Sequence, residues 1–151
     1  MNTGDTLPDF TLNDQQGQPF SISAVKGKQA VVVYFYPKNF TPGCTKEACS
    51  FRDAYEDFKD LGAEVIGISA DNDTSHQKFA QQYNLPFILL ADTKNKVRKL
   101  FDVKSKLLGL LPGRETFVFD ANGILVYTFE SMGAIKHIEK SLMYLQKNSD
   151  G

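Results

Sequence analysis

The sequence has little of three things: cysteine, net charge and long apolar stretches. Its 151 residues include only two cysteines, and 17 basic residues nearly balance 18 acidic ones, for a net charge of −1. This balance gives no electrostatic reason to expect nucleic acid or an anionic membrane as a partner. No apolar stretch approaches the roughly 18 residues that a membrane helix needs. Two cysteines are also too few for a disulfide-stapled secreted scaffold.

The first residues do not resemble a secretory signal. Residues 1–5 have neither the charged n-region nor the apolar h-region of such a segment. We therefore expect a cytoplasmic location, in a reducing compartment where a thiol pair is more often catalytic than structural. A transit sequence removed upstream of Met1 would leave no trace in this chain.

Length and composition predict one globular domain over residues 1–151. The chain is long enough for one hydrophobic core and short for two. Its apolar content is 42%, with 12 phenylalanines, which is typical of a folded protein. The sequence contains no repeat, no low-complexity segment and no linker long enough to divide it.

Hydrophobic patterning predicts a mixed α/β fold. The predicted strands are short strands within residues 8–27, followed by 30–36, 64–69, 87–91, 116–120 and 124–129. The predicted helices are 44–61, one opened by the capping residues 73 and 74, a short one at 97–101 and one near the C-terminus at 135–145. The sheet should be parallel where helices intervene and antiparallel at the last hairpin. This order fits a thioredoxin-like fold with helices on both faces of the sheet and an N-terminal β-hairpin.

The segment that carries chemistry runs from Pro37 to Cys44 and reads Pro-Lys-Asn-Phe-Thr-Pro-Gly-Cys. It places Cys44 where a buried strand ends and a helix begins, with the Thr41 hydroxyl three residues earlier. Unpaired backbone N–H groups and the helix dipole favour an anion at such a junction. The thiolate, which is the reactive form, is therefore favoured. We predict that Cys44 is a nucleophile rather than an inert buried thiol.

Cys49, the second cysteine, follows Cys44 after four residues. A helical rotation of about 100° per residue puts Cys44 on the apolar face and Cys49 about 140° away. The two Cα atoms are then roughly 8.5 Å apart on a regular helix, whereas a disulfide needs roughly 4.4–6.8 Å. A bond between these cysteines therefore requires the first turns of the helix to unwind. The alternative is that Cys49 is an incidental surface thiol.

A family resemblance rests on this segment. Pro37, Thr41 and Cys44 reproduce the P-x-x-x-T-x-x-C signature of the peroxiredoxins, and residues 35–53 resemble the PrxQ/BCP (bacterioferritin comigratory protein) subfamily. The likeness covers nearly the whole chain and includes residues 9–12, 62–69 and 114–117. It implies a thiol-dependent peroxidase in which Cys44 attacks hydrogen peroxide or an organic hydroperoxide. Cys49 then resolves the sulfenic acid as a Cys44–Cys49 disulfide, which thioredoxin or a similar dithiol reduces.

The resemblance also assigns supporting residues, and it needs no metal or other cofactor. Thr41 and Arg114 support the attack, because a hydroxyl and a guanidinium can stabilise charge moving onto the leaving oxygen. Pro37 shapes the pocket, and backbone N–H groups near Gly43 can add donors. Glu47 has two interpretations: a first-turn carboxylate favoured by the helix dipole, or part of a hydrogen-bond network behind the pocket. Arg114 could also be only a surface charge before a strand.

Two other functions fit a thiol pair: a general thiol-disulfide oxidoreductase, which the absence of C-x-x-C disfavours, and a noncatalytic redox-sensing module. His76 and His137 are distant from the motif in sequence, which disfavours a Cys-His hydrolase, and the two thiols do not supply a zinc ligand set. Asn39 stands where many relatives have Asp, and we assign it no chemical task. The apolar stretch Leu107–Leu111 is either a helix end packed on the core or a wall of the substrate pocket near Arg114. We expect a monomer with a hydroperoxide and a dithiol as partners.

Overall fold

The computed structural model describes residues 1–103, 113–130 and 135–149. The strands are β1 (Thr11–Asp14), β2 (Pro19–Ser21), β3 (Ala30–Phe35), β4 (Ala63–Ser69), β5 (Ile88–Ala91), β6 (Glu115–Phe119) and β7 (Leu125–Glu130). The α-helices are α1 (Pro42–Asp53), α2 (Tyr55–Asp60), α3 (Asp73–Tyr83), α4 (Lys96–Leu100) and α5 (Ile135–Ser149), and a 3-10 turn η1 spans Ile22–Ala24. No helix within these ranges is long and apolar enough to cross a membrane. The stretch Leu107–Leu111 lies outside the described residues.

Within the described residues, one mixed sheet has the strand order β2-β1-β5-β4-β3-β6-β7. The pairs β3–β4 and β4–β5 are parallel, and a helical segment connects each pair. The pair β6–β7 is an antiparallel hairpin, and β1–β2 forms a second one near the N-terminus. The predicted mixed sheet and its N-terminal hairpin are therefore confirmed.

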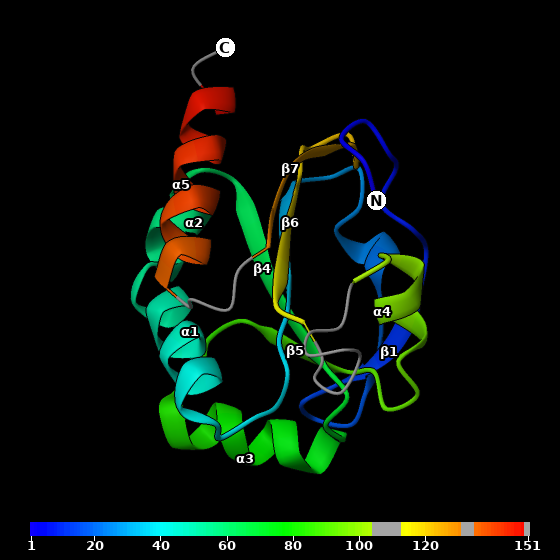
Figure 1. Ribbon diagram of the computed structural model, residues 1–151, viewed down its shortest axis with the longest axis vertical. Coiled ribbons are helices and arrows are strands. Elements are labelled where there is room, and N and C mark those ends of the chain that lie inside the picture. The colour runs from blue at the N-terminus through cyan, green and yellow to red at the C-terminus, as the bar shows by residue number, and fades with distance from the viewer. Residues whose placement is uncertain (104–112, 131–134, 150–151) are drawn as a thin grey trace.

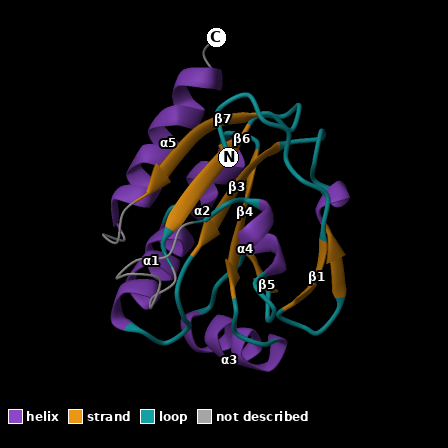
Figure 2. Ribbon diagram, turned by 45° about the vertical axis from the view of Figure 1, so that its right-hand side comes forward, coloured by secondary structure: helices purple, strands orange, loops and turns teal. Residues whose placement is uncertain are grey.

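Strand β3 explains why both faces of the sheet are covered. Its six residues are all buried, and successive side chains point to opposite faces. Val32 and Tyr34 join a core with side chains from α1, α2, α3 and α5. Val31 and Val33 join a second core with α4 and η1. Figures 1 and 2 show α1, α2 and α5 along one side of the sheet and α4 on the other.

A glycine makes room for the aromatic contact on which α1 packs. Tyr34 pairs with Gly67 across β3 and β4, and a Cβ at Gly67 would lie 2.7 Å from the Tyr34 ring. The same ring stacks on Phe51 of α1, with centroids 4.5 Å apart. Only a residue without a side chain at position 67 allows this arrangement without displacement of the ring.

Two predicted helices differ from the observed ones. The predicted helix 44–61 is interrupted at Ala54, where φ is −98° and ψ is 2°, and continues as α2. The apolar spacing from Phe51 to Phe58 continues across this break, so the spacing could not reveal it. Helix α1 also begins at Pro42 rather than Cys44, because proline suits the first helical position. The N-cap of α3 is Asn72 rather than the predicted residues 73 and 74, and its side chain accepts the Ser75 N–H at 2.8 Å.

Candidate active site

Cys44 lies in the first turn of α1 and is 2% exposed. Thr41 is the N-cap, with extended backbone, and its carbonyl accepts the Thr45 N–H at 2.9 Å. The turn therefore begins immediately after the loop that leaves β3. This placement matches the strand-to-helix junction predicted from the sequence.

Arg114 connects Cys44 with Glu47. It precedes β6, and its Nη2 donates to Cys44 Sγ at 3.3 Å while its Nη1 donates to Glu47 Oε1. Arg114 is 3% exposed and Glu47 is fully buried, so Arg114 is not a surface charge and Glu47 is not a solvated first-turn carboxylate. Cys44 and Glu47 are three residues apart on α1, a spacing that puts both on one face. Residues 70 positions apart in the sequence thus form one charged cluster.

Burial sets the charges of this cluster. It raises the pKa of Glu47 to about 8, although Arg114 works in the opposite direction. Burial also works to lower the pKa of Arg114, but Glu47 and Cys44 outweigh it and raise that pKa above its ordinary value. The guanidinium therefore stays charged and faces two acidic groups. A proton on Glu47 leaves the positive charge of Arg114 available to a thiolate at Cys44.

The remaining predicted residues lie in α1 or in the loop that precedes it. A Cβ at Gly43 would lie 3.1 Å from Arg114 Nη2, so glycine permits the close approach of the guanidinium. Pro37 is half-buried in the loop between β3 and α1, and its pocket-shaping role stays a prediction. The Thr41 hydroxyl donates to the Lys38 carbonyl at 2.8 Å. Thr41 was predicted to donate to the substrate, but this bond engages its hydrogen and leaves its lone pairs to accept.

Both cysteines are free. Cys49 is half-buried further along α1, which is continuous from Pro42 to Asp53. The intact helix keeps the two Cα atoms beyond disulfide range, at the roughly 8.5 Å of regular helical geometry.

Asn39, to which the sequence assigned no task, is the centre of a buried hydrogen-bond network. It is 3% exposed, and its carboxamide accepts the Tyr36 hydroxyl at 2.6 Å and donates to Ser75 Oγ at 3.1 Å. The same amide nitrogen lies 2.9 Å from His76 Nδ1, and the Asn39 backbone N–H donates to Asp71 at 2.9 Å. The network fastens the loop before Cys44 to α3 and to the residues after β4. A single asparagine in a loop carries no sequence signal of such burial.

Arg98 of α4 is another residue that the sequence did not indicate. Its Nη1 donates to the Gly113 carbonyl at 3.0 Å, and its Nη2 donates to the Tyr36 carbonyl at 3.2 Å. These bonds join the chain just before Arg114 to the end of β3. An arginine in a short helix normally indicates solvent exposure, which is why the pattern did not reveal it.

His137 lies beside the site although it is distant in sequence. Its Nδ1 is 2.7 Å from Thr116 Oγ1 and 3.8 Å from Glu47 Oε2. The sequence predicted its helix but not this position, because nothing in the local pattern of α5 specifies which helix it contacts.

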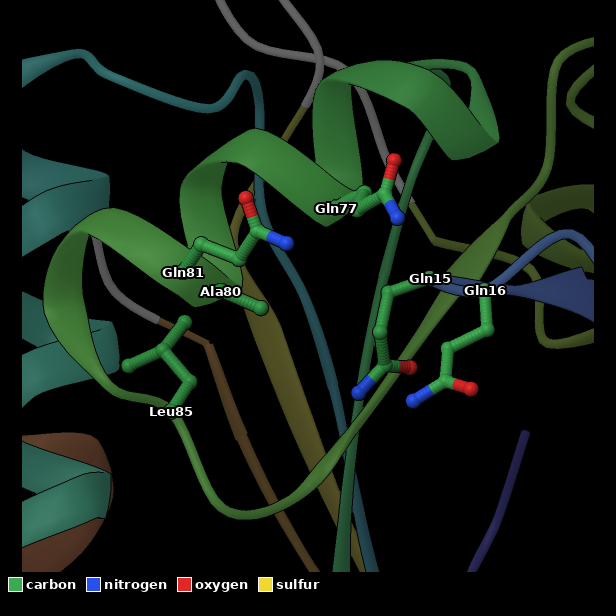
Figure 3. A pocket seen from close by; sticks show the side chains of 6 residues that line it. All are labelled: Gln15, Gln16, Gln77, Ala80, Gln81 and Leu85. Atoms are coloured by element: carbon green, nitrogen blue, oxygen red, sulfur yellow. The ribbon is translucent and has the colours of Figure 1, made fainter.

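A surface hollow of about 350 Å³ lies between α3 and the turn after β1 (Figure 3). It is lined by Gln15, Gln16, Gln77, Ala80, Gln81 and Leu85. The Gln15 carboxamide donates to the Phe87 carbonyl and accepts the Leu89 N–H, so it extends the hydrogen bonding of β5. None of the predicted site residues lines the hollow, and we assign it no role.

Comparison with known proteins decides the family. The AhpC/TSA family matches residues 3–128. This chain belongs to the AhpC/TSA family. The chloroplastic peroxiredoxin Q of Sedum lineare is 58% identical to this family member over 148 residues, covering 97% of the chain and 78% of that protein. The chloroplastic peroxiredoxin Q of Arabidopsis thaliana is 53% identical over 148 residues, with 97% and 68% covered.

Solved structures give the same result for this AhpC/TSA-family protein. Peroxidoxin BcpB from Mycobacterium tuberculosis aligns with a TM-score of 0.89 and 40% identity, over 97% of each chain. A cysteine-to-serine mutant of Xylella fastidiosa PrxQ aligns with a TM-score of 0.91 and 28% identity, over 99% of this chain and 98% of that one. The predicted PrxQ/BCP membership and thioredoxin-like fold are confirmed. The protein is a thiol-dependent peroxidase, in a family that uses peroxide substrates and thioredoxin-type reductants.

The predicted cytoplasmic location is wrong. Relatives that are 53% to 58% identical are chloroplastic proteins. An organelle address is read from a separate, removable segment rather than from the catalytic domain. The composition and thiol chemistry of the domain therefore could not identify the compartment.

Proposed function

We propose that this AhpC/TSA-family peroxidase reduces hydrogen peroxide and organic hydroperoxides with Cys44 as the attacking thiol and Cys49 as the resolving thiol. The observation that carries the proposal is the bond from Arg114 Nη2 to Cys44 Sγ at 3.3 Å, in a cluster that also buries Glu47. The thiolate is the nucleophilic form of a thiol, and Arg114 places a fixed cation within hydrogen-bond distance of this sulfur.

In the first step, the Cys44 thiolate attacks the terminal oxygen of the hydroperoxide. The S–O bond forms as the O–O bond breaks, and the leaving oxygen takes up a proton to depart as water or an alcohol. Arg114 lies where negative charge passes from sulfur to oxygen, so it stabilises the transition state. The Thr41 oxygen can accept a hydrogen bond from the hydroperoxide, since its own hydrogen is donated to Lys38.

In the second step, Cys49 attacks the sulfur of the Cys44 sulfenic acid and releases water. The helical turns between them must unwind first, because α1 holds the two residues apart. An external dithiol then reduces the disulfide by thiol-disulfide exchange.

The setting of this cycle is inferred from the relatives and the fold. The chloroplastic peroxiredoxin Q relatives support a plastid location, with a thioredoxin-type protein as the dithiol. We further propose that residues 1–151 form one domain and act as a monomer. The sheet from β1 to β7 and the packing of α5 on α1 and β6 support the single domain.

Peroxide consumption coupled to a dithiol tests the proposal. Cys44→Ser should abolish consumption, because an alcohol is far less nucleophilic than a thiolate. Cys49→Ser should consume one equivalent and then stop as a sulfenic acid that a dione reagent traps. Loss of the first oxidation in Cys49→Ser and its retention in Cys44→Ser would reverse the assignment.

Two further assays separate the alternative functions. Insulin reduction without peroxide consumption would support a general thiol-disulfide oxidoreductase. Stoichiometric disulfide formation without turnover with any dithiol would support a redox sensor.

A further inference from the structure

His137 is a buried residue of α5 that meets three other elements. It is 0% exposed, and its ring packs edge-on against Phe129 of β7, with centroids 4.8 Å apart and planes at 76°. Nδ1 lies 2.7 Å from Thr116 Oγ1 of β6 and 3.8 Å from Glu47 Oε2 of α1. The ring is therefore held in one orientation, with one nitrogen directed at the active-site cluster.

Glu47 presents a different partner to each oxygen. Oε1 accepts from Arg114 Nη1, whereas Oε2 accepts no hydrogen bond from the described residues and faces His137 Nδ1. A carboxyl group can rotate about its last bond, so one bond to Arg114 does not fix its plane. The position of the group next to Oε2 therefore sets the orientation of the carboxyl plane, and with it the direction in which Oε1 faces the guanidinium.

We propose that His137 is a positioning residue of the active site: its ring holds the second oxygen of Glu47, and through Glu47 it fixes Arg114 against Cys44. Thr116 holds the ring nitrogen in place at 2.7 Å. The proposal rests on the proposed role of Cys44 as the attacking thiol. His137 itself touches no reacting atom.

The charge balance of the cluster supports this arrangement. Burial raises the pKa of Glu47 to about 8, so the carboxyl keeps a proton at neutral pH. Arg114 donates to Oε1, so that proton lies on Oε2, the oxygen that faces His137 Nδ1. The contact between Oε2 and Nδ1 at 3.8 Å is a polar contact rather than a hydrogen bond, because Thr116 occupies the one in-plane hydrogen-bonding site of Nδ1 at 2.7 Å. The Arg114 side chain also lies on the same side of β6 as Thr116, because residues two apart on an extended strand share a face.

The test measures the first oxidation step alone, in a Cys49→Ser parent that forms no Cys44–Cys49 disulfide. The parent is mixed rapidly with hydrogen peroxide, quenched with an alkylating reagent and analysed by mass spectrometry. His137→Phe keeps the aromatic packing on Phe129 and removes the nitrogen, so the rate should fall about tenfold. His137→Asn restores a polar group near the Nδ1 position, one that can both donate and accept, and should recover most of the rate. Thr116→Val should slow the step in the same direction by a smaller factor.

A double-mutant cycle distinguishes positioning through Glu47 from a general loss of packing. In a Glu47→Gln background, His137→Phe should change the rate by less than about twofold, because coupled residues are not additive. The matched control is Ser141→Ala, which removes a buried hydroxyl that donates to the His137 carbonyl at 2.6 Å and leaves the ring untouched. Its oxidation rate should equal that of the parent.

Three results would overturn the proposal: an unchanged rate in His137→Phe, full additivity with Glu47→Gln, or an equal loss in Ser141→Ala. Thermal unfolding of each variant shows whether it is folded. If His137→Phe does not fold, His137→Asn and Thr116→Val carry the test, and parent-like rates in a Thr116→Val that is folded count against it. A parent that is not oxidised at all would contradict the proposed function instead.

Discussion

The α-carbon of Gly43 faces the Arg114 guanidinium so closely that a Cβ would lie 3.1 Å from Nη2. The same Nη2 donates to Cys44 Sγ at 3.3 Å. Arg114 is buried and also bonded to Glu47, so it cannot move aside without loss of one of these contacts.

Gly43→Ala should therefore slow the first oxidation of Cys44 by roughly 10- to 100-fold, because small misplacements of a catalytic group have effects of that size. Alanine favours the helix, which should offset part of the stability lost where the buried Arg114 shifts. Single-turnover oxidation by hydrogen peroxide measures the effect. Lys46→Ala, at an exposed position in the same helix, is the control and should react like wild type. Equal rates in the two variants would show that Gly43 does not govern the position of Arg114.

Arg98→Lys should weaken both the fold and the first step. Lysine keeps the charge but lacks the forked guanidinium, whose two nitrogens donate to the Gly113 and Tyr36 carbonyls. We expect the free energy of unfolding to fall by about 1–3 kcal/mol, since buried acceptors lose a partner. The rate should fall as well, because Gly113 directly precedes Arg114.

Chemical denaturation and single-turnover oxidation measure the two effects of Arg98→Lys. Lys99→Met, at the exposed neighbouring position, should change neither. A stability loss with a normal oxidation rate would separate Arg98 from the placement of Arg114.

Asn39→Asp should raise the pKa of His76. His76 Nε2 lies 3.0 Å from the Leu90 carbonyl, which can only accept, so Nδ1 of the neutral ring is left to accept from the Asn39 amide. Burial lowers the pKa of His76 below its ordinary 6.5. An aspartate can only accept, and it would therefore favour a proton on Nδ1.

The pH dependence of stability follows from the same shift. In wild type the folded state binds fewer protons at His76, so its contribution to stability falls as the pH drops below about 6.5. In Asn39→Asp this loss should shrink or change sign. NMR titration of the histidine ring, assigned with a His76→Gln variant, and unfolding midpoints from about pH 5 to 8 measure both effects. A His76 pKa that is no higher in the variant than in wild type would contradict this interpretation.

Oxidation should loosen α1 locally. The Cys44–Cys49 bond cannot form on the intact helix, so the disulfide form must give up the hydrogen bonds of at least the first turn. Amides of residues 41–51 should exchange faster after oxidation, while β3 and β6 stay protected. Hydrogen exchange followed by mass spectrometry measures this, with peroxide-treated Cys49→Ser as the control that is oxidised without the bond. Equal protection of α1 in the reduced and disulfide forms would rule out unwinding.

The sequence predicted the features that depend on local pattern. It did not predict contacts between residues that are distant in the sequence and meet only in the folded chain. An unbroken apolar run is enough to predict a buried strand such as β3. The motif around Cys44 placed the thiol at the correct strand-to-helix junction. Arg114 was assigned by resemblance alone, since no spacing rule links it to a residue 70 positions away. Its contact with Cys44 exists because β3 and β6 pair side by side.

The residues that the sequence missed are polar and buried. Asn39 and Arg98 have types that normally occur at the surface, and His137 has a type of intermediate burial, so hydrophobic periodicity does not register them. Each is buried because its hydrogen-bond partners come from other elements. The direction of the Thr41 hydroxyl was also beyond prediction, because it depends on the path of the backbone at Lys38.

Glu47 lies between the two cysteines on α1, within the turns that must open for the disulfide. In the proposed cycle, closing the disulfide would therefore move away the carboxyl that holds Arg114, so disulfide formation would disassemble the site. A second hydroperoxide would find no assembled site until a dithiol has restored the helix. The proposed cycle would then consume one peroxide per reduction, and the Cys44 sulfur would escape further oxidation to the sulfinic acid as long as unwinding is faster than reaction with the next peroxide.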